Sequence, residues 1–201
     1  QPTPAQQSAT QLSEAHSPLQ HIEQRVQRRA AGLALDMSAA ASLATLRRVV
    51  EDEIAQWNLD HRRGVRPFEL VDAEAVADRA MRNLTGFGPL QALLDDPDVW
   101  EIMVNAPDAI FVRRHHGPSG YHHEGFHDDD HGVRTITKLL DEAGSHRKLD
   151  PAEGLQDAQL ASGARLHIVH GDVARGGHLM VNIRKFSTSA FGRLDQLVAR
   201  D

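Results

Sequence analysis

The chain has 201 residues, a formal net charge of −6 and no cysteine. This length predicts one or two domains of ordinary size. Without cysteine the chain has no disulfide, thiolate metal site or cysteine nucleophile, and its acidic balance argues against a general nucleic-acid binder. No run approaches the roughly 18 apolar residues of a membrane-spanning helix, and residues 1–20 lack the basic start and apolar stretch of a secretory signal. We therefore expect a cytoplasmic protein.

The first part of the chain is predicted to be helical. Residues 1–18 are rich in proline, glutamine and serine and bury too little apolar surface to offset the entropy of ordering, so we expect a disordered lead-in. Over residues 19–94, apolar side chains recur every three or four positions, a spacing typical of amphipathic helices. Helices are predicted at 19–32, from a cap at Ser38 to a loop at 60–67, at 72–84 and at 89–94. We expect these helices to pack as a small bundle.

The second of these helices has an apolar stripe that predicts its buried side. The stripe consists of Leu43, Leu46, Val49, Val50, Ile54 and Trp57. Trp100, which begins the next segment, also lies in an apolar pattern. We expect both tryptophans in the core.

After Pro97 the pattern changes from helical spacing to alternation, which indicates strands. Strands are predicted at 100–105, 109–114, 121–126, 166–170 and 178–184, and helices at 128–144 and 191–198. Strands and a helix within one short segment predict an α+β domain over residues 95–186.

Histidines are concentrated after the second predicted strand. They are His115, His116, His122, His123, His127 and His131, next to Asp128, Asp129 and Asp130. If Gly117–Gly120 is the tip of a hairpin, the first two pairs could face each other at ligand distance for a divalent metal. Their spacing is not one that zinc sites require, and adjacent histidines on a strand point to opposite faces. We therefore expect a solvated hairpin and no metal site.

Three basic residues mark the ends of the last two predicted strands. Arg165 begins one strand, and Arg184 and Lys185 end the next. If the strands are antiparallel neighbours, these ends meet, and guanidinium groups there could hold a phosphate. From residue type alone, the alternative to a phosphate site is that these arginines are solvated or form ion pairs with Asp157 or Glu153. The chain has no phosphate-binding loop, dinucleotide-binding glycine motif or metalloprotease motif, so we expect no catalytic residue in it.

Residues 84–113 resemble the N-terminal domain of the secretion ATPases of type II and type IV systems, most closely the CpaF-like branch of the tight-adherence (Tad) pilus. A Gly-x-Gly-Pro-Leu segment, a Glu-Ile-Met-Val-Asn strand, a Pro-Asp turn and a second strand follow one another as in that family. Residues 157–169 and 181–187 resemble two further motifs of the family, although Gln159 and Lys185 stand where the family has arginines. The helical region, residues 19–83, also resembles the helical extension of this branch, although less specifically. The resemblance covers about residues 19–201.

The resemblance implies a fold and a role. Full-length members are hexameric ring ATPases in which a nucleotide lies between a PAS-like α+β N-terminal domain and a RecA-like motor domain. It therefore implies a helical bundle followed by a PAS-like α/β-sandwich domain with a mostly antiparallel sheet. Residues 187–201 would lead toward a RecA-like motor domain that this fragment lacks. ATP and magnesium would belong to the full-length protein, with none in the fragment, and Arg165, Arg184 and Lys185 would contact the nucleotide phosphates.

The resemblance also implies partners and a location. The partners would be the missing motor domain, further copies in a homo-hexamer, and the inner-membrane platform proteins of a secretion or pilus machine, with no nucleic acid. The protein would be cytoplasmic and peripheral at the inner face of the cell membrane. One alternative is a stand-alone PAS-like adaptor or sensor that binds a ligand or partner without hydrolysis. A DNA-binding helical module is disfavoured because the chain is acidic.

Overall fold

The chain divides into two units between Gly88 and Pro89. The computed structural model describes residues 17–36, 39–142 and 149–185. In these ranges helices come first and an antiparallel sheet follows, so the predicted α+β class is confirmed. The lead-in before Ser17, the cap at Ser38, and the linker 187–201 with its predicted helix lie outside the described residues.

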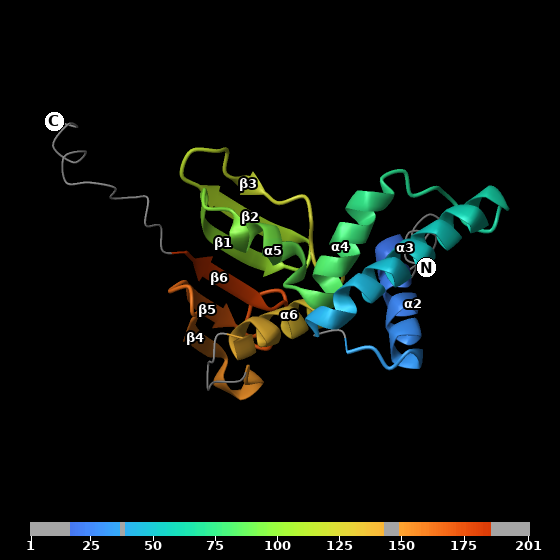
Figure 1. Cartoon of the computed structure of the whole chain (residues 1–201). Helices are drawn as coiled ribbons and strands as arrows, with labels where there is room; N and C mark the ends of the chain where they lie inside the picture. Colours follow the sequence, from blue (N-terminus) through green and yellow to red (C-terminus); the bar gives the residue numbers. More distant parts are fainter. Residues whose placement is uncertain (1–16, 37–38, 143–148, 186–201) are drawn as a thin grey trace, which may run out of the picture. The chain divides into compact units, whose positions relative to one another are not determined.

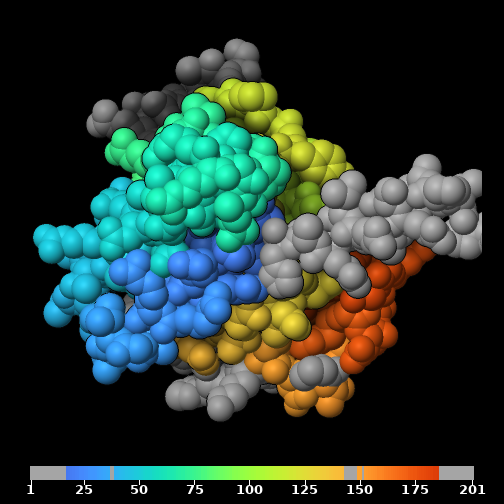
Figure 2. Space-filling model, turned by 90° about the vertical axis from the view of Figure 1, so that its right-hand side faces the viewer, coloured from blue at the N-terminus to red at the C-terminus, as the bar shows by residue number. Residues whose placement is uncertain are grey.

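Three helices form the first unit. They are α2 (Pro18–Gly32), α3 (Ala40–Arg62) and α4 (Ala73–Thr85). Ser17 caps α2, because its hydroxyl accepts a hydrogen bond of 3.2 Å from the backbone N–H of Gln20. Asp72 caps α4 in the same way, at 3.0 Å from the N–H of Ala75. Figure 2 shows α2 (blue) lying beside α3 (cyan to teal).

The core of the first unit lies between these three helices. It consists of Ile22, Val26, Ala30, Leu46, Val49, Val50, Ile54, Ala77 and Ala80. Leu43 was predicted to belong to it, but this prediction is wrong: Leu43 is 37 % exposed. It lies in the first turn of α3, one turn before Leu46, the first buried residue of the helix. Within the stripe the helix buries a charged residue, Glu53, that the apolar pattern does not reveal.

A six-stranded antiparallel sheet forms the second unit. Its strands are β1 (Val99–Ala106), β2 (Ala109–Arg114), β3 (Gly120–Tyr121), β4 (Leu155–Gln159), β5 (Arg165–Val169) and β6 (Met180–Arg184). Their order across the sheet is β3-β2-β1-β6-β5-β4 (Figure 1). The remaining elements are η1 (Gly88–Leu90), α5 (Gln91–Asp95), α6 (Asp129–Glu142) and η2 (Pro151–Glu153).

One face of the sheet is buried. Its side chains are Ile102, Val104, Ile110, Val112, Leu166, Ile168, Val181 and Ile183. Figure 1 shows α5 and α6 on one side of the sheet, and their buried side chains, among them Leu93, Ile136 and Leu140, supply the apolar surface that covers this face. Because side chains alternate along a strand, the residues between these buried positions point to the other face. That face, here called the open face, carries the charged and polar residues.

One strand was predicted too long, and one strand was not predicted at all. The third strand was predicted at 121–126 but includes only Gly120–Tyr121. After it the chain turns so tightly against the β1–β2 turn that a Cβ on Gly125 would lie 2.8 Å from the carbonyl oxygen of Pro107. β4 was not predicted, because its apolar and polar residues lie on the opposite faces to those expected: Leu155 is 58 % exposed and Gln156 is buried.

Trp100 is half-buried rather than in the core. The register of β1 against β2 shifts between Val99 and Glu101, which displaces Trp100 from the regular alternation. Its ring centre lies 5.7 Å from the guanidinium carbon of Arg113. Trp57, by contrast, is buried, as predicted.

No helix within the described ranges combines the length and the apolar composition needed to cross a membrane.

Candidate functional site

Charged residues form a row across the open face of the sheet. Arg165 of β5 lies directly opposite Arg184 of β6, so the predicted meeting of these strand ends is confirmed. Arg184 also faces Glu101 of β1, and Glu101 faces Arg113 of β2. Two pairs of neighbouring strands that are distant from each other in sequence, β1–β2 and β5–β6, therefore place three arginines and one glutamate side by side.

Glu101 is the buried member of this row. It is 2 % exposed, whereas the side chain of Arg184 is 70 % exposed. Its Oε1 accepts hydrogen bonds from Arg184 Nε at 2.8 Å and from Asn182 Nδ2 at 3.1 Å. Its Oε2 lies 3.4 Å from Nη1 of Arg113. Burial alone raises the pKa of Glu101, but the hydrogen bonds from Arg184 and Asn182 and the two guanidinium charges outweigh burial and lower it.

A hollow of about 350 Å³ lies beside the two paired arginines. Its lining consists of Asp157, Arg165, Leu166, His167, Asn182 and Arg184. The imidazole Nδ1 of His167 lies 2.7 Å from Oδ1 of Asp157, its direct partner on β4. The hollow thus presents two guanidinium groups, an amide and an imidazole, with a single carboxylate already in contact with the imidazole. This set of mostly hydrogen-bond donors suits an anion with several oxygen atoms.

Lys185 is not brought together with the two arginines. It follows Arg184 directly, so its side chain leaves the strand on the opposite side. Its Nζ donates hydrogen bonds to the carbonyl oxygens of Leu93, at 3.0 Å, and Asp96, at 2.6 Å. Burial is the main cause that lowers the pKa of Lys185, although the charges of Asp96 and Asp95 act against it. The contact of Lys185 with a phosphate stays a prediction.

The histidines after β2 are divided among several small contacts. His116 Nδ1 lies 3.0 Å from Oδ1 of Asp98, and the rings of His122 and His123 lie edge to face with centroids 4.6 Å apart. His131 is buried in α6. In the described part of the chain, no three histidine, aspartate or glutamate side chains are grouped so that they could hold a metal ion.

The residues that complete the site were not predicted from the sequence. Glu101, His167 and Asn182 all lie within predicted strands, where only their apolar neighbours were interpreted. A usable signal was present for Glu101, because a glutamate inside the apolar run Trp-Glu-Ile-Met-Val needs a cationic partner if it is buried.

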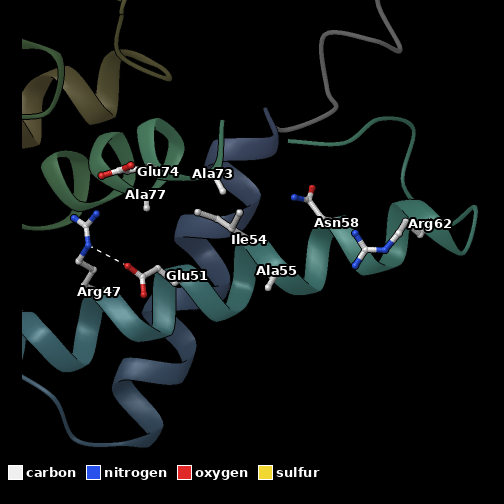
Figure 3. Close-up of a pocket in the computed structure, with 9 residues that line it drawn as sticks. All are labelled: Arg47, Glu51, Ile54, Ala55, Asn58, Arg62, Ala73, Glu74 and Ala77. Carbon is white, nitrogen blue, oxygen red and sulfur yellow. Dashed lines mark hydrogen bonds and ion pairs between the residues drawn. The ribbon is translucent and has the colours of Figure 1, made fainter. Parts of the chain in front are cut away.

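A second hollow, of about 530 Å³, lies in the first unit between α3 and α4 (Figure 3). Its floor is apolar, with Ile54 from α3 and Ala77 from α4. Two of the charged groups at its rim are already paired: Arg47 lies 3.1 Å from Glu51, and it also lies 2.7 Å from Asp78. This hollow lacks the paired guanidinium groups of the hollow beside Arg165 and Arg184.

No protein-family model matches the chain, and no curated protein sequence matches it either. Among solved structures, the chain is similar to the VirB11 ATPase of the Brucella suis type IV secretion system, which was determined in complex with sulphate. The two are 25 % identical, with a TM-score of 0.46 over 56 % of this chain. This chain corresponds to 33 % of that ATPase chain, about a third of its length.

Proposed function

We propose that the second unit is the N-terminal domain of a hexameric ATPase that drives secretion or assembles a Tad or type IV pilus. The observation that carries the proposal is the cross-strand pair of Arg165 and Arg184 beside the hollow on the open face. These two arginines are also the ones that the sequence resemblance assigns to the nucleotide phosphates. The antiparallel sheet and its helical cover agree with the PAS-like fold that the resemblance implies.

The chemistry of the hollow fits a phosphate group. Directly opposed residues on antiparallel strands have Cα atoms about 5 Å apart, so both guanidinium groups can reach the oxygens of one phosphate. Two planar guanidinium groups neutralise the negative charge that spreads over the terminal phosphate oxygens during phosphoryl transfer. Magnesium takes several oxygen ligands, whereas the only carboxylate in the lining of this hollow, that of Asp157, is already in contact with His167. In this proposal the fragment contributes binding and orientation of the phosphates, and a motor domain supplies magnesium binding and hydrolysis.

The proposal extends to partners and location. The helical unit exposes three large apolar side chains in and beside the α3–α4 connection: Val65 is 69 % exposed, Phe68 46 % and Val71 93 %. All three lie in one short connection, and exposed apolar side chains that form a contiguous surface mark protein contacts. We propose that they contact neighbouring subunits or the inner-membrane platform of the machine, which would hold the protein at the inner face of the membrane.

The first test is the reading frame after Asp201. A Gly-x-x-x-x-Gly-Lys-Ser/Thr motif within about 60 codons would supply the phosphate loop of the motor domain. A stop codon would contradict the proposal that this unit belongs to an ATPase. It would favour the alternative, a PAS-like adaptor that binds an anionic ligand in the same hollow without hydrolysis.

The second test is ATP hydrolysis by the parent protein. Arg165→Ala and Arg184→Ala should each lower kcat by roughly 100- to 1,000-fold, as expected when a group that stabilises transition-state charge is removed. Arg134→Ala is the matched control, because Arg134 is an exposed arginine on α6. Equal kcat values for all three variants would refute the role of the arginine pair.

A further inference from the structure

We propose that Glu101 is a latch for Arg184: it holds the arginine while the hollow is empty, and it passes the arginine to a phosphate when one binds. The proposal rests on the proposed function of Arg184 and adds its regulation. Three observations support it: the burial of Glu101, the way in which Arg184 contacts it, and the presence of a replacement partner.

The first observation is that Arg184 contacts Glu101 with only part of its guanidinium group. The hydrogen bond runs from Nε, and within the described residues no other hydrogen bond of this side chain is found. The side chain is 70 % exposed. Its two terminal nitrogens are therefore available for a bidentate contact with a phosphate, and the side chain can swing away from Glu101 without disturbing the core.

The second observation is that Glu101 does not lose all its partners when Arg184 leaves. A carboxylate that is only 2 % exposed cannot remain ionised without partners. Asn182 lies 3.1 Å from Oε1, and Arg113 lies 3.4 Å from Oε2. The side chain of Arg113 is 51 % exposed, so it can move closer to the carboxylate. The buried charge stays neutralised in both arrangements.

The relative strengths of the two ion pairs also favour the exchange. Ion pairs with a well-exposed partner are weak, because water competes for the charge. A phosphate carries more charge than a carboxylate and accepts the same forked hydrogen bonds. The Glu101 pair is therefore strong enough to order Arg184 and weak enough for a phosphate to replace it. It follows that the Glu101 charge lowers the affinity of the hollow for anions.

This consequence can be measured on the chain itself, with inorganic pyrophosphate and ATP as probes in magnesium-free buffer. Chemical-shift titration gives the dissociation constant, and the undisturbed peaks report the fold of each variant. Glu101→Gln should bind each probe about three- to tenfold more tightly than the parent chain. Glu142→Gln is the matched control: it removes the same charge from an exposed pair on α6 and should leave the affinity unchanged.

Three further variants, Arg113→Ala, Arg165→Ala and Arg184→Ala, distinguish the latch from the role of the arginine pair. Arg113→Ala removes the replacement partner and should weaken binding, because Glu101 then keeps Arg184. Arg184→Ala alone should weaken binding. In the double variant, Arg184→Ala should cancel the gain in affinity that Glu101→Gln gives. If Arg184→Ala weakens binding but Glu101→Gln does not strengthen it, the latch is refuted and the arginine role stands. If neither Arg165→Ala nor Arg184→Ala weakens binding, the proposed function of the pair fails.

Discussion

Glu53 provides the sharpest test of how the helical unit is stabilised. It lies on α3, is 4 % exposed, and contacts two arginines of α2. Arg29 Nη1 lies 2.9 Å from its Oε1, and Arg25 Nε donates to its Oε2. Burial raises the pKa of Glu53, but the hydrogen bonds from Arg25 and Arg29 outweigh burial, so the pKa lies below its ordinary value.

The change is Glu53→Gln, which keeps the volume and removes the charge. Hydrogen bonds to a charged group contribute about 1.5–3 kcal/mol. Here the side chains of both arginines are 43 % exposed, so water competes for these hydrogen bonds and their contribution is smaller. We expect the free energy of unfolding of the first unit to fall by about 1–2 kcal/mol.

Glu51→Gln is the matched control on the same helix. Glu51 lies 3.1 Å from Arg47, but the two side chains are 54 % and 39 % exposed. An exposed pair of this kind contributes less than about 0.5 kcal/mol. The two variants remove the same charge from the same helix and differ mainly in burial.

The assay is urea unfolding followed by tryptophan fluorescence in a Trp100→Phe background. Trp57 of α3 is then the one tryptophan in the chain, and it reports on the first unit alone. The midpoint should fall clearly for Glu53→Gln and hardly for Glu51→Gln, with an unchanged slope. Equal midpoints would refute the reasoning, because burial of the carboxylate would then add nothing to the ion pair.

Three further predictions concern both units. Acid should destabilise them, because the pKa values of Glu53, Glu101 and Asp96 are lower in the folded chain than in the unfolded chain. The stabilisation from these carboxylates is complete above the unfolded pKa values, about 4, and is lost as the pH falls through the folded pKa values. A urea midpoint at pH 3 equal to that at pH 7 would contradict this. Gly171→Ala should destabilise the second unit by about 1–3 kcal/mol, because its Cβ would lie 2.6 Å from the carbonyl oxygen of Gly177, whereas Gly120→Ala has nothing within 4 Å and should be near neutral in the same melts. Lys185→Met should cost the second unit about 1–2 kcal/mol, because the carbonyls of Leu93 and Asp96 each lose the hydrogen bond from Nζ, although Asp96 keeps the one from the N–H of Val99. A loss of pyrophosphate affinity as large as that of Arg184→Ala would instead show that Lys185 contacts the phosphate.

Part of this structure followed from local patterns. The three- and four-residue spacing located α2, α3 and α4, and alternation located β1, β2, β5 and β6. Residue type alone left the role of Arg165 and Arg184 open, and the contact with phosphate that the family resemblance implies stays a prediction. Antiparallel pairing of adjacent strands was enough to place Arg165 opposite Arg184. These features depend on neighbours in sequence or on a single hairpin connection, so the sequence alone determined them.

The rest depended on packing between distant segments. Glu101 and Arg184 are 83 positions apart, and their pairing exists because β6 inserts next to β1. Alternation indicates the face on which a side chain lies, but it does not identify the strand beside it or the depth of burial. The partners of Glu101, the turn of Lys185 toward Leu93 and the exposure of Leu43 were therefore decided by the tertiary structure, because each depends on which surface covers that residue.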